Sequence, residues 1–116
     1  MAINKKEEFS KEDNQIAAFA KALSHPARVA ILNFLAGQNK CICGDIVEIM
    51  PLSQSTVSQH LKELKNAGII QGEIEGASSC YCINWDNLKK EIQSFTEFIN
   101  KLKENDSIAC CAVKEK

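Results

Sequence analysis

Pro-Leu-Ser-Gln-Ser-Thr-Val-Ser-Gln-His-Leu-Lys-Glu-Leu-Lys-Asn-Ala-Gly-Ile-Ile, residues 51–70, is the stretch of sequence that decides the fold. Pro51 and Ser53 predict a turn followed by a helix that Ser53 caps. Gly68 is expected to end this helix, because glycine readily adopts the left-handed dihedrals found just past a helix end. Apolar residues recur at helical spacing along it: Val57, Leu61 and Leu64.

The opposite side of this predicted helix carries hydrogen-bonding groups and positive charge: Ser55, Gln59, Lys62 and Asn66, flanked by Ser58 and Lys65. After a short helix and a tight turn, such a helix is the second helix of a helix-turn-helix, which enters the DNA major groove. An ordinary amphipathic helix with a solvated polar face is the alternative, and the pattern alone does not separate the two. The candidate DNA-binding residues are Ser53, Gln54, Ser55, Thr56, Ser58, Gln59, Lys62 and Lys65.

The charge of the chain limits the ways in which it could contact DNA. The net charge is −1, so binding requires a local positive patch. Arg28 is the single arginine, which leaves residues 53–66 without a bidentate arginine-guanine contact. We therefore expect Gln59 to read adenine, and we expect lysines, hydroxyls and backbone amides to contact the phosphates.

Length and composition indicate one globular domain. The chain has 116 residues, 45% of them hydrophobic, which suffices for one core. Its N-terminus is charged and lacks the apolar segment of a signal peptide, and no apolar run approaches the roughly 20 residues of a membrane span. We expect a cytoplasmic protein with no membrane partner.

The chain has six cysteines, in the pairs Cys41/Cys43, Cys80/Cys82 and Cys110/Cys111. In a cytoplasmic protein they are expected to be reduced thiols for metal, metalloid or redox chemistry.

The remaining pattern predicts an α+β, mainly helical fold. Helices are expected from Asp13 to Leu23, between Pro26 and Gly37, and over 46–50, before the helix quoted above. Strands over 69–74 and 78–83 then form a hairpin, the wing of a winged helix-turn-helix, which carries Glu73 and Glu75 and no basic residue. The expected organisation is a flexible N-terminus (1–12), a winged helix-turn-helix dimer domain (13–104) and a cysteine-containing tail (105–116).

The last helix carries the apolar seam of a paired helix. Its apolar residues follow a 4-3-4-3 spacing, which is typical of helix pairing. Packing on the core of its own chain is the alternative, but a dimer would place two reading helices one DNA turn apart on a palindrome. The predicted N- and C-terminal dimerisation helices contribute Ile16, Phe19, Leu88, Ile92, Phe95, Ile99 and Leu102.

Two motifs resemble the ArsR/SmtB family of metal-responsive repressors. Residues 23–32, Leu-Ser-His-Pro-Ala-Arg-Val-Ala-Ile-Leu, are similar to that family's L-x-H-P-x-R-x-x-I-L signature. Residues 52–61, followed by Leu64, Ala67 and Gly68, are similar to its recognition helix. The resemblance covers residues 13 to about 103. It implies a homodimeric winged helix-turn-helix that represses a resistance operon by binding double-stranded operator DNA, and that leaves DNA when an inducer binds.

The resemblance also bears on the cysteines. Cys41-Ile42-Cys43 is similar to the Cys-x-Cys of the family's third-helix metal site, although Gly44 intervenes before the Asp. The family's zinc site of His and carboxylates has no counterpart, since the last helix has no histidine. Cys110-Cys111 resembles the terminal thiols of arsenic-sensing members. The implied inducer is As(III) or Sb(III) bound to Cys41, Cys43, Cys110 and Cys111, with no organic cofactor.

Other interpretations of these cysteines stay open. In the family's topology the segment before the third helix pairs with the last wing strand, which would add Cys80 and Cys82 as a four-sulfur cluster, although we favour a structural role for this pair. Cys41 and Cys43 could instead be small buried hydrophobes, and the terminal pair incidental.

The alternative functions are a redox or persulfide sensor, in which Cys41 or Cys43 cross-links to Cys110 or Cys111, and a Cd- or Pb-sensing repressor. A thiol-rich metal-binding module without a DNA role is a further possibility. Neither His25 nor His60 has an Asp or Cys neighbour that suggests a catalytic pair, so we expect no enzyme.

Overall fold

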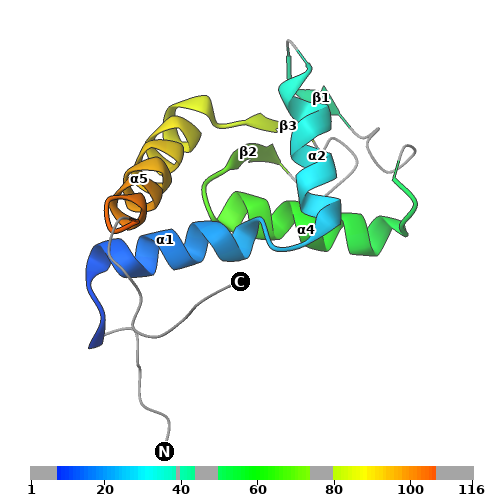
Figure 1. The fold of residues 1–116 in the computed structure, drawn as a ribbon. Helices are drawn as coiled ribbons and strands as arrows, with labels where there is room; N and C mark the ends of the chain where they lie inside the picture. The colour runs from blue at the N-terminus through cyan, green and yellow to red at the C-terminus, as the bar shows by residue number, and fades with distance from the viewer. Residues whose placement is uncertain (1–7, 39, 44–49, 74–79, 107–116) are drawn as a thin grey trace, which may run out of the picture.

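The computed structural model describes residues 8–38, 40–43, 50–73 and 80–106. Their elements, in chain order, are α1 (Lys11–Ala22), α2 (Pro26–Ala36), β1 (Ile42–Cys43), α4 (Gln54–Asn66), β2 (Ile70–Glu73), β3 (Cys80–Ile83) and α5 (Trp85–Lys103). Four helices and a small sheet make the mainly helical α+β fold that the sequence predicts (Figure 1). The helix expected over 46–50 lies, but for its last residue, outside the described residues, as do the tip of the wing and the terminal cysteine pair.

Side-chain caps set where the first two helices begin. The Ser10 hydroxyl accepts a hydrogen bond from the Asp13 amide at 3.0 Å, so α1 begins two residues before the expected start. His25 caps α2 by accepting the Ala27 amide on Nδ1 at 2.9 Å, and Pro26 fills the first helical position, where its missing N–H costs nothing. The predicted break between α1 and α2 is therefore confirmed.

The sheet has the strand order β1-β3-β2, and both of its pairs are antiparallel. Alternation along β3 sends Tyr81 and Ile83 into the core, while Cys80 and Cys82 face outward. Opposite Tyr81, Gly72 has a φ of 123°, and a Cβ there would collide with the Cys80 carbonyl oxygen and the Tyr81 Cα. Glycine at this position lets β2 lie close against β3.

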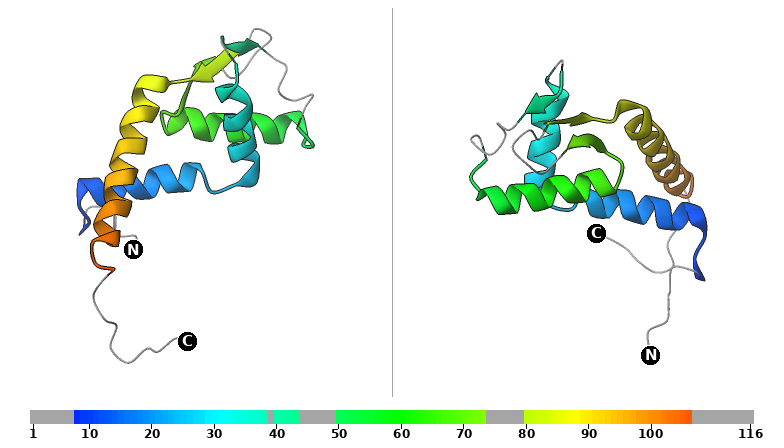
Figure 2. Two further views of the ribbon diagram at one scale, coloured as in Figure 1. Left: turned by 45° about the horizontal axis from the view of Figure 1, so that its top comes forward. Right: turned by 180° about the vertical axis from the view of Figure 1, so that it is seen from behind.

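The core joins α2, α4 and the sheet, and a second contact joins the two terminal helices. Ile31, Val57, Leu64, Ile69 and Ile70 are fully buried in this core. From the end of β3, α5 runs away from the sheet and packs on α1 (Figure 2), where the Phe19 and Phe95 rings meet edge to face, with their centroids 5.6 Å apart. None of the described helices is long and apolar enough to cross a membrane.

Candidate nucleic-acid interface and cysteine cluster

Helix α4 is held at both ends as the sequence predicts. The Ser53 hydroxyl accepts the Thr56 amide at 3.3 Å. At the other end Gly68 has a φ of 79°, and its amide bonds to the Lys65 carbonyl at 2.9 Å. The next amide, of Ile69, bonds to the Leu64 carbonyl at 3.0 Å, which completes a Schellman motif. These caps fix the length of the helix at Gln54–Asn66.

One face of α4 is buried and the other is polar. Val57, Leu61 and Leu64 lie in the core, as their spacing predicts. Of the predicted DNA-binding residues, Ser53, Gln54, Ser55, Thr56, Gln59 and Lys65 are exposed, and Ser58 and Lys62 are half-buried. The cap already uses two hydroxyls, since the Ser53 Oγ lies 3.0 Å from the Thr56 Oγ1. Gln54, Gln59, Lys62 and Lys65 are the members of this set whose side chains are long enough to reach beyond the backbone.

Glu63 is a residue of this face that the sequence reasoning missed. The Gln59 Nε2 donates to the Glu63 Oε2 at 3.2 Å. This bond uses one of the two N–H groups of the amide and fixes its orientation. The carbonyl oxygen and the second N–H remain, and these are the acceptor and donor that adenine recognition requires. The i, i+4 spacing of the two residues was the signal in the sequence.

His60 anchors α4 to α2. The His60 side chain is only 8% exposed, and its Nδ1 accepts a hydrogen bond from the Arg28 Nε at 3.1 Å. The His25 ring lies against it, with the centroids 4.3 Å apart. Burial, and then the charges of His25 and Arg28, lower the pKa of His60, while Glu63 opposes the shift. His60 is thereby held in the neutral form, which keeps an acceptor for Arg28.

Arg28 also binds the end of α1. Its Nη1 donates to the carbonyl oxygens of Lys21 at 3.2 Å and Ala22 at 3.4 Å. One guanidinium therefore ties the last turn of α1 and the middle of α4 to the start of α2. The side chain fixes the position of α4 relative to α1 and α2.

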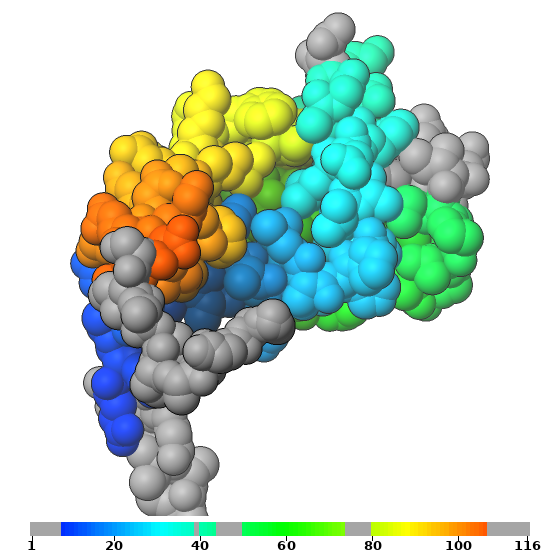
Figure 3. Space-filling model, viewed as in Figure 1, coloured from blue at the N-terminus to red at the C-terminus, as the bar shows by residue number. Residues whose placement is uncertain are grey.

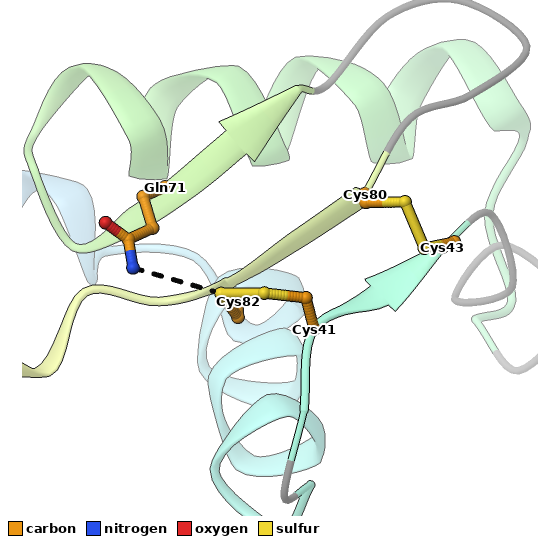
Figure 4. Close-up of a disulfide and its surroundings, with 5 residues drawn as sticks. All are labelled: Cys41, Cys43, Gln71, Cys80 and Cys82. Atoms are coloured by element: carbon orange, nitrogen blue, oxygen red, sulfur yellow. Dashed lines mark hydrogen bonds between the residues drawn. A yellow bond between two sulfur atoms is a disulfide. The ribbon is translucent and has the colours of Figure 1, made fainter.

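Four cysteines meet across β1 and β3 and form what we call the four-cysteine cluster: Cys41, Cys43, Cys80 and Cys82. Register brings them together, because Cys43 lies opposite Cys80, and Cys41, one residue before the strand, lies opposite Cys82. The Cα atoms are 4.0 Å apart in the first pair and 4.5 Å in the second. Each pair forms a cross-strand disulfide on the outer face of the sheet (Figure 4).

The third strand extends both pairs into rows. Gln71 of β2 lies opposite Cys82, and its Nε2 donates to the Cys82 sulfur at 3.9 Å (Figure 4). Two positions along, Glu73 lies opposite Cys80. One row is therefore Gln71–Cys82–Cys41, and the other is Glu73–Cys80–Cys43. The sequence contained a signal for this arrangement, because Gln71 and Glu73 are two residues apart in a strand and must therefore share one face of the sheet.

The expectation of reduced thiols is wrong for these four residues, which are bonded in pairs. The register of β1 on β3 does bring Cys41 and Cys43 beside Cys82 and Cys80, as the family's topology suggested. The alternative cross-link to Cys110 or Cys111 involves residues outside the described part of the chain. The physical reason for the bonding is the register of β1 on β3, which places the Cα atoms of the opposing cysteines 4.0 and 4.5 Å apart. Among the residues that the structure describes, no group of three or more His, Cys, Asp or Glu side chains is arranged to hold a metal ion.

Comparison with known proteins gives the family. Residues 25–71 match the model of the bacterial regulatory protein, arsR family. The transcriptional repressor SdpR of Bacillus subtilis is 37% identical over 81 residues, which are 70% of this chain and 89% of that protein. The chain belongs to the ArsR family. It is a transcriptional repressor of the ArsR/SmtB type, whose helix-turn-helix binds operator DNA.

Two further comparisons concern the signal and the fold. The arsenical resistance operon repressor of Staphylococcus xylosus is 29% identical over 102 residues, 86% of this chain and 89% of that protein. The solved ArsR-like transcriptional regulator from Rhodococcus sp. RHA1 superposes with a TM-score of 0.62 at 20% identity, over 88% of this chain and 99% of that one. This second likeness confirms the winged helix-turn-helix fold.

The residues predicted for the dimer interface of this ArsR-family chain separate into two groups. Phe19 and Leu88 are buried in the core of the protomer, and Phe95 is half-buried against it. Ile16 is half-buried and lines, with Phe98, a groove between α1 and α5. The exposed members are Ile92 (46%), Ile99 (37%) and Leu102 (55%).

Proposed function

We propose that this repressor binds DNA as a homodimer and that oxidation of the four-cysteine cluster releases it. One observation carries the proposal: two disulfides join β1, which leads into the helix-turn-helix, to β3 of the wing. Forming or breaking these bonds changes how firmly the wing is fixed beside the reading helix. The oxidised and reduced states must then differ in their affinity for DNA, and by linkage DNA must protect the thiols from oxidation to the same degree.

A binding experiment tests this redox control. DNA selected from a random library by the dithiothreitol-reduced protein serves as the operator. The diamide-oxidised protein should bind it at least tenfold more weakly, which is the effect of about 1.4 kcal/mol of coupling. The variant with serine at all four positions of the cluster is the matched control and should lose this dependence. Equal affinities of the reduced and oxidised wild-type protein would refute redox control.

DNA reading is assigned to the polar face of α4. The exposed Gln59 amide, oriented by Glu63, supports base recognition, and Lys62 supports phosphate binding. Gln59→Ala should relax base preference, whereas Lys62→Ala should weaken binding to every sequence and flatten its salt dependence. If Gln59→Ala lost the same affinity for selected and random DNA, base reading by Gln59 would be excluded.

A homodimer is supported by the outer stripe of α5. Ile92, Ile99 and Leu102 are exposed at a spacing of seven and three residues, the a/d pattern of helix pairing. Together with α1, α5 forms one end of the molecule (Figure 3). Ile99→Glu should shift the protein from dimer to monomer in sedimentation equilibrium. Lys103→Glu, one turn further on, is the control for added charge.

As(III) or Sb(III) is a second candidate signal. Its support is the similarity to the S. xylosus arsenical repressor, together with four sulfurs on one face, which become soft ligands once reduced. The disulfides occupy these sulfurs, so the metalloid requires the reduced protein. Arsenite in a reducing buffer should then release DNA, with a Ser variant of Cys110 and Cys111 showing whether the tail takes part. Retention of DNA at a large excess of arsenite would exclude this signal.

A further inference from the structure

Each disulfide joins one cysteine of residues 41–43 to one cysteine of residues 80–82, but the two bonds have different chemical surroundings. Both join one exposed residue, Cys41 or Cys43, to one half-buried residue, Cys82 or Cys80. They differ in the residue of β2 that completes each row. In directly opposed positions of an antiparallel pair, side chains on the same face lie about 5 Å apart at Cβ, so this neighbour acts on the sulfur directly.

At Cys82 the neighbour is a hydrogen-bond donor. The Gln71 Nε2 lies 3.9 Å from the Cys82 sulfur and points at it (Figure 4). A neutral disulfide sulfur is a weak acceptor, and a thiolate is a strong one. This bond therefore strengthens as negative charge develops on Cys82. At Cys80 the opposed residue is Glu73, whose carboxylate makes negative charge less favourable.

We propose that Cys41–Cys82 is the exchangeable disulfide of the cluster, which a low-molecular-weight thiol opens first, and that Cys43–Cys80 is the persistent one. Gln71 is the positioning residue that sets this order, through its hydrogen bond to the departing sulfur. The proposal deepens the redox control proposed above, because it assigns the regulatory event to one of the two bonds.

The exchange follows from these surroundings. The thiolate of the small molecule attacks the sulfur of Cys41, the exposed residue of the pair. A new S–S bond forms, and the bond to Cys82 breaks with its electron pair leaving on Cys82. A second small thiolate attacks the small-molecule sulfur of this mixed disulfide and releases Cys41 as a thiolate. Two small thiols are oxidised to their disulfide, the protein disulfide is reduced to two thiols, and the protons of the small thiols pass through solvent to the cysteines.

The order is tested by timed reduction of the full-length oxidised protein with 2-mercaptoethanol. Free thiols are alkylated at each time point, and the peptides containing each cysteine are quantified by mass spectrometry. Cys41 and Cys82 should become reactive about fivefold faster than Cys43 and Cys80, the effect expected of one ordinary hydrogen bond. Two variants that keep one disulfide each, Cys43→Ser/Cys80→Ser and Cys41→Ser/Cys82→Ser, repeat the measurement without exchange between the pairs.

Exchanging the residues at positions 71 and 73 tests whether these neighbours, rather than the solvent exposure of the cysteines, set the order of reduction. The double variant Gln71→Glu/Glu73→Gln keeps net charge and composition and exchanges the two surroundings. Both residues are exposed at the sheet edge, so folding, checked by circular dichroism, should be kept. The swap should make Cys43–Cys80 the faster bond. Equal rates in the wild type, or an order that the swap leaves unchanged, would overturn the proposal.

DNA binding is measured separately, so that a failure of the proposed exchange order can be distinguished from a failure of the proposed redox control. An ordered exchange with no change in DNA affinity would refute redox control and leave the order standing. Redox-dependent DNA binding with unordered exchange would refute the proposed order and leave redox control standing. If both proposals hold, the Cys43→Ser/Cys80→Ser variant keeps the response of DNA binding to oxidation, and the Cys41→Ser/Cys82→Ser variant loses most of it.

Discussion

Arg28→Met should show how much of the stability of the packing of α4 against α2 depends on the Arg28 guanidinium. Methionine keeps an unbranched apolar stem, so the change removes the hydrogen bonds and little packing. The largest cost is the His60 Nδ1, which lies 3.1 Å from the Arg28 Nε and loses its donor in a side chain that is 8% exposed. An unsatisfied buried acceptor costs about 1–3 kcal/mol.

The bonds from Arg28 to the end of α1 add less. The Lys21 carbonyl oxygen also accepts from the Ser24 hydroxyl at 2.7 Å, and this end of the helix is open to water. We assign about 0.5 kcal/mol to their loss, at the low end of a hydrogen bond's net contribution. The free energy of unfolding should therefore fall by about 1.5–3.5 kcal/mol, measured by urea denaturation at neutral pH.

A double-mutant cycle isolates the contact with His60. If the cost comes from an orphaned acceptor, His60→Phe should remove most of the penalty of Arg28→Met, because both partners are then apolar. The coupling free energy should be about 1–3 kcal/mol, the cost of the orphaned acceptor. A single-variant loss below about 0.5 kcal/mol, within the range of ordinary surface substitutions, would refute the reasoning.

Three further outcomes follow. The pKa of His60 is lowered in the fold from its ordinary 6.5, so its stabilising contribution is complete above pH 6.5 and is lost as pH falls through the folded pKa; urea denaturation between pH 7.5 and 5 should show a decline that His60→Phe makes shallower. Gly72→Ala should cost about 2 kcal/mol or more, because the added Cβ meets the backbone of β3 beside Tyr81 and the φ of 123° is strained; thermal unfolding measures this, with Gly37→Ala, which meets only ordinary contacts, as the control. Glu63→Ala frees the Gln59 amide, so discrimination against a wrong base at the adenine position should fall several-fold in competition binding, while binding to random DNA rises slightly because a negative charge is removed.

Local patterns predicted the parts of this protein that local physics controls. The cap at Ser53, the buried stripe of α4 and the stop at Gly68 each follow from residues within one helix, so the sequence was sufficient. The start of α1 was placed two residues late, because Ser10 was not considered as its cap. The fold class followed from the order of these elements.

Contacts between distant residues were beyond the sequence pattern. Family topology suggested that the two Cys-x-Cys segments lie together, but direct bonding depends on register across separations of 41 and 37 residues. A slip of one residue would turn the sulfurs of one strand to the other face. The neutral state of His60 depends likewise on burial and on Arg28, 32 residues away in sequence.

The connection between the sulfurs and the reading helix is short. Beyond β3 a single residue, Asn84, caps α5, and its amide donates to the Ile69 carbonyl oxygen at 2.9 Å. One turn later the Asn87 Nδ2 donates to the carbonyl oxygen of Gly68, just past the end of α4, at 2.8 Å. The end of the reading helix is thus bonded to the start of α5, and β3, which holds two of the sulfurs, continues directly into that same start.

A displacement of β3 therefore cannot leave α5 and the end of α4 where they were. If α5 is the dimer helix, the movement changes the angle between protomers and with it the separation of two α4 helices that must match one turn of DNA. Small changes in this angle are sufficient to weaken DNA binding, because each of the two α4 helices must enter its own segment of the major groove. In the proposed dimer, covalent bonds that fix β3 to β1 thus act on the separation of the two α4 helices, which a dimeric DNA reader cannot adjust locally. This gives the redox control that we propose a physical route to DNA binding, although the cluster lies outside α4.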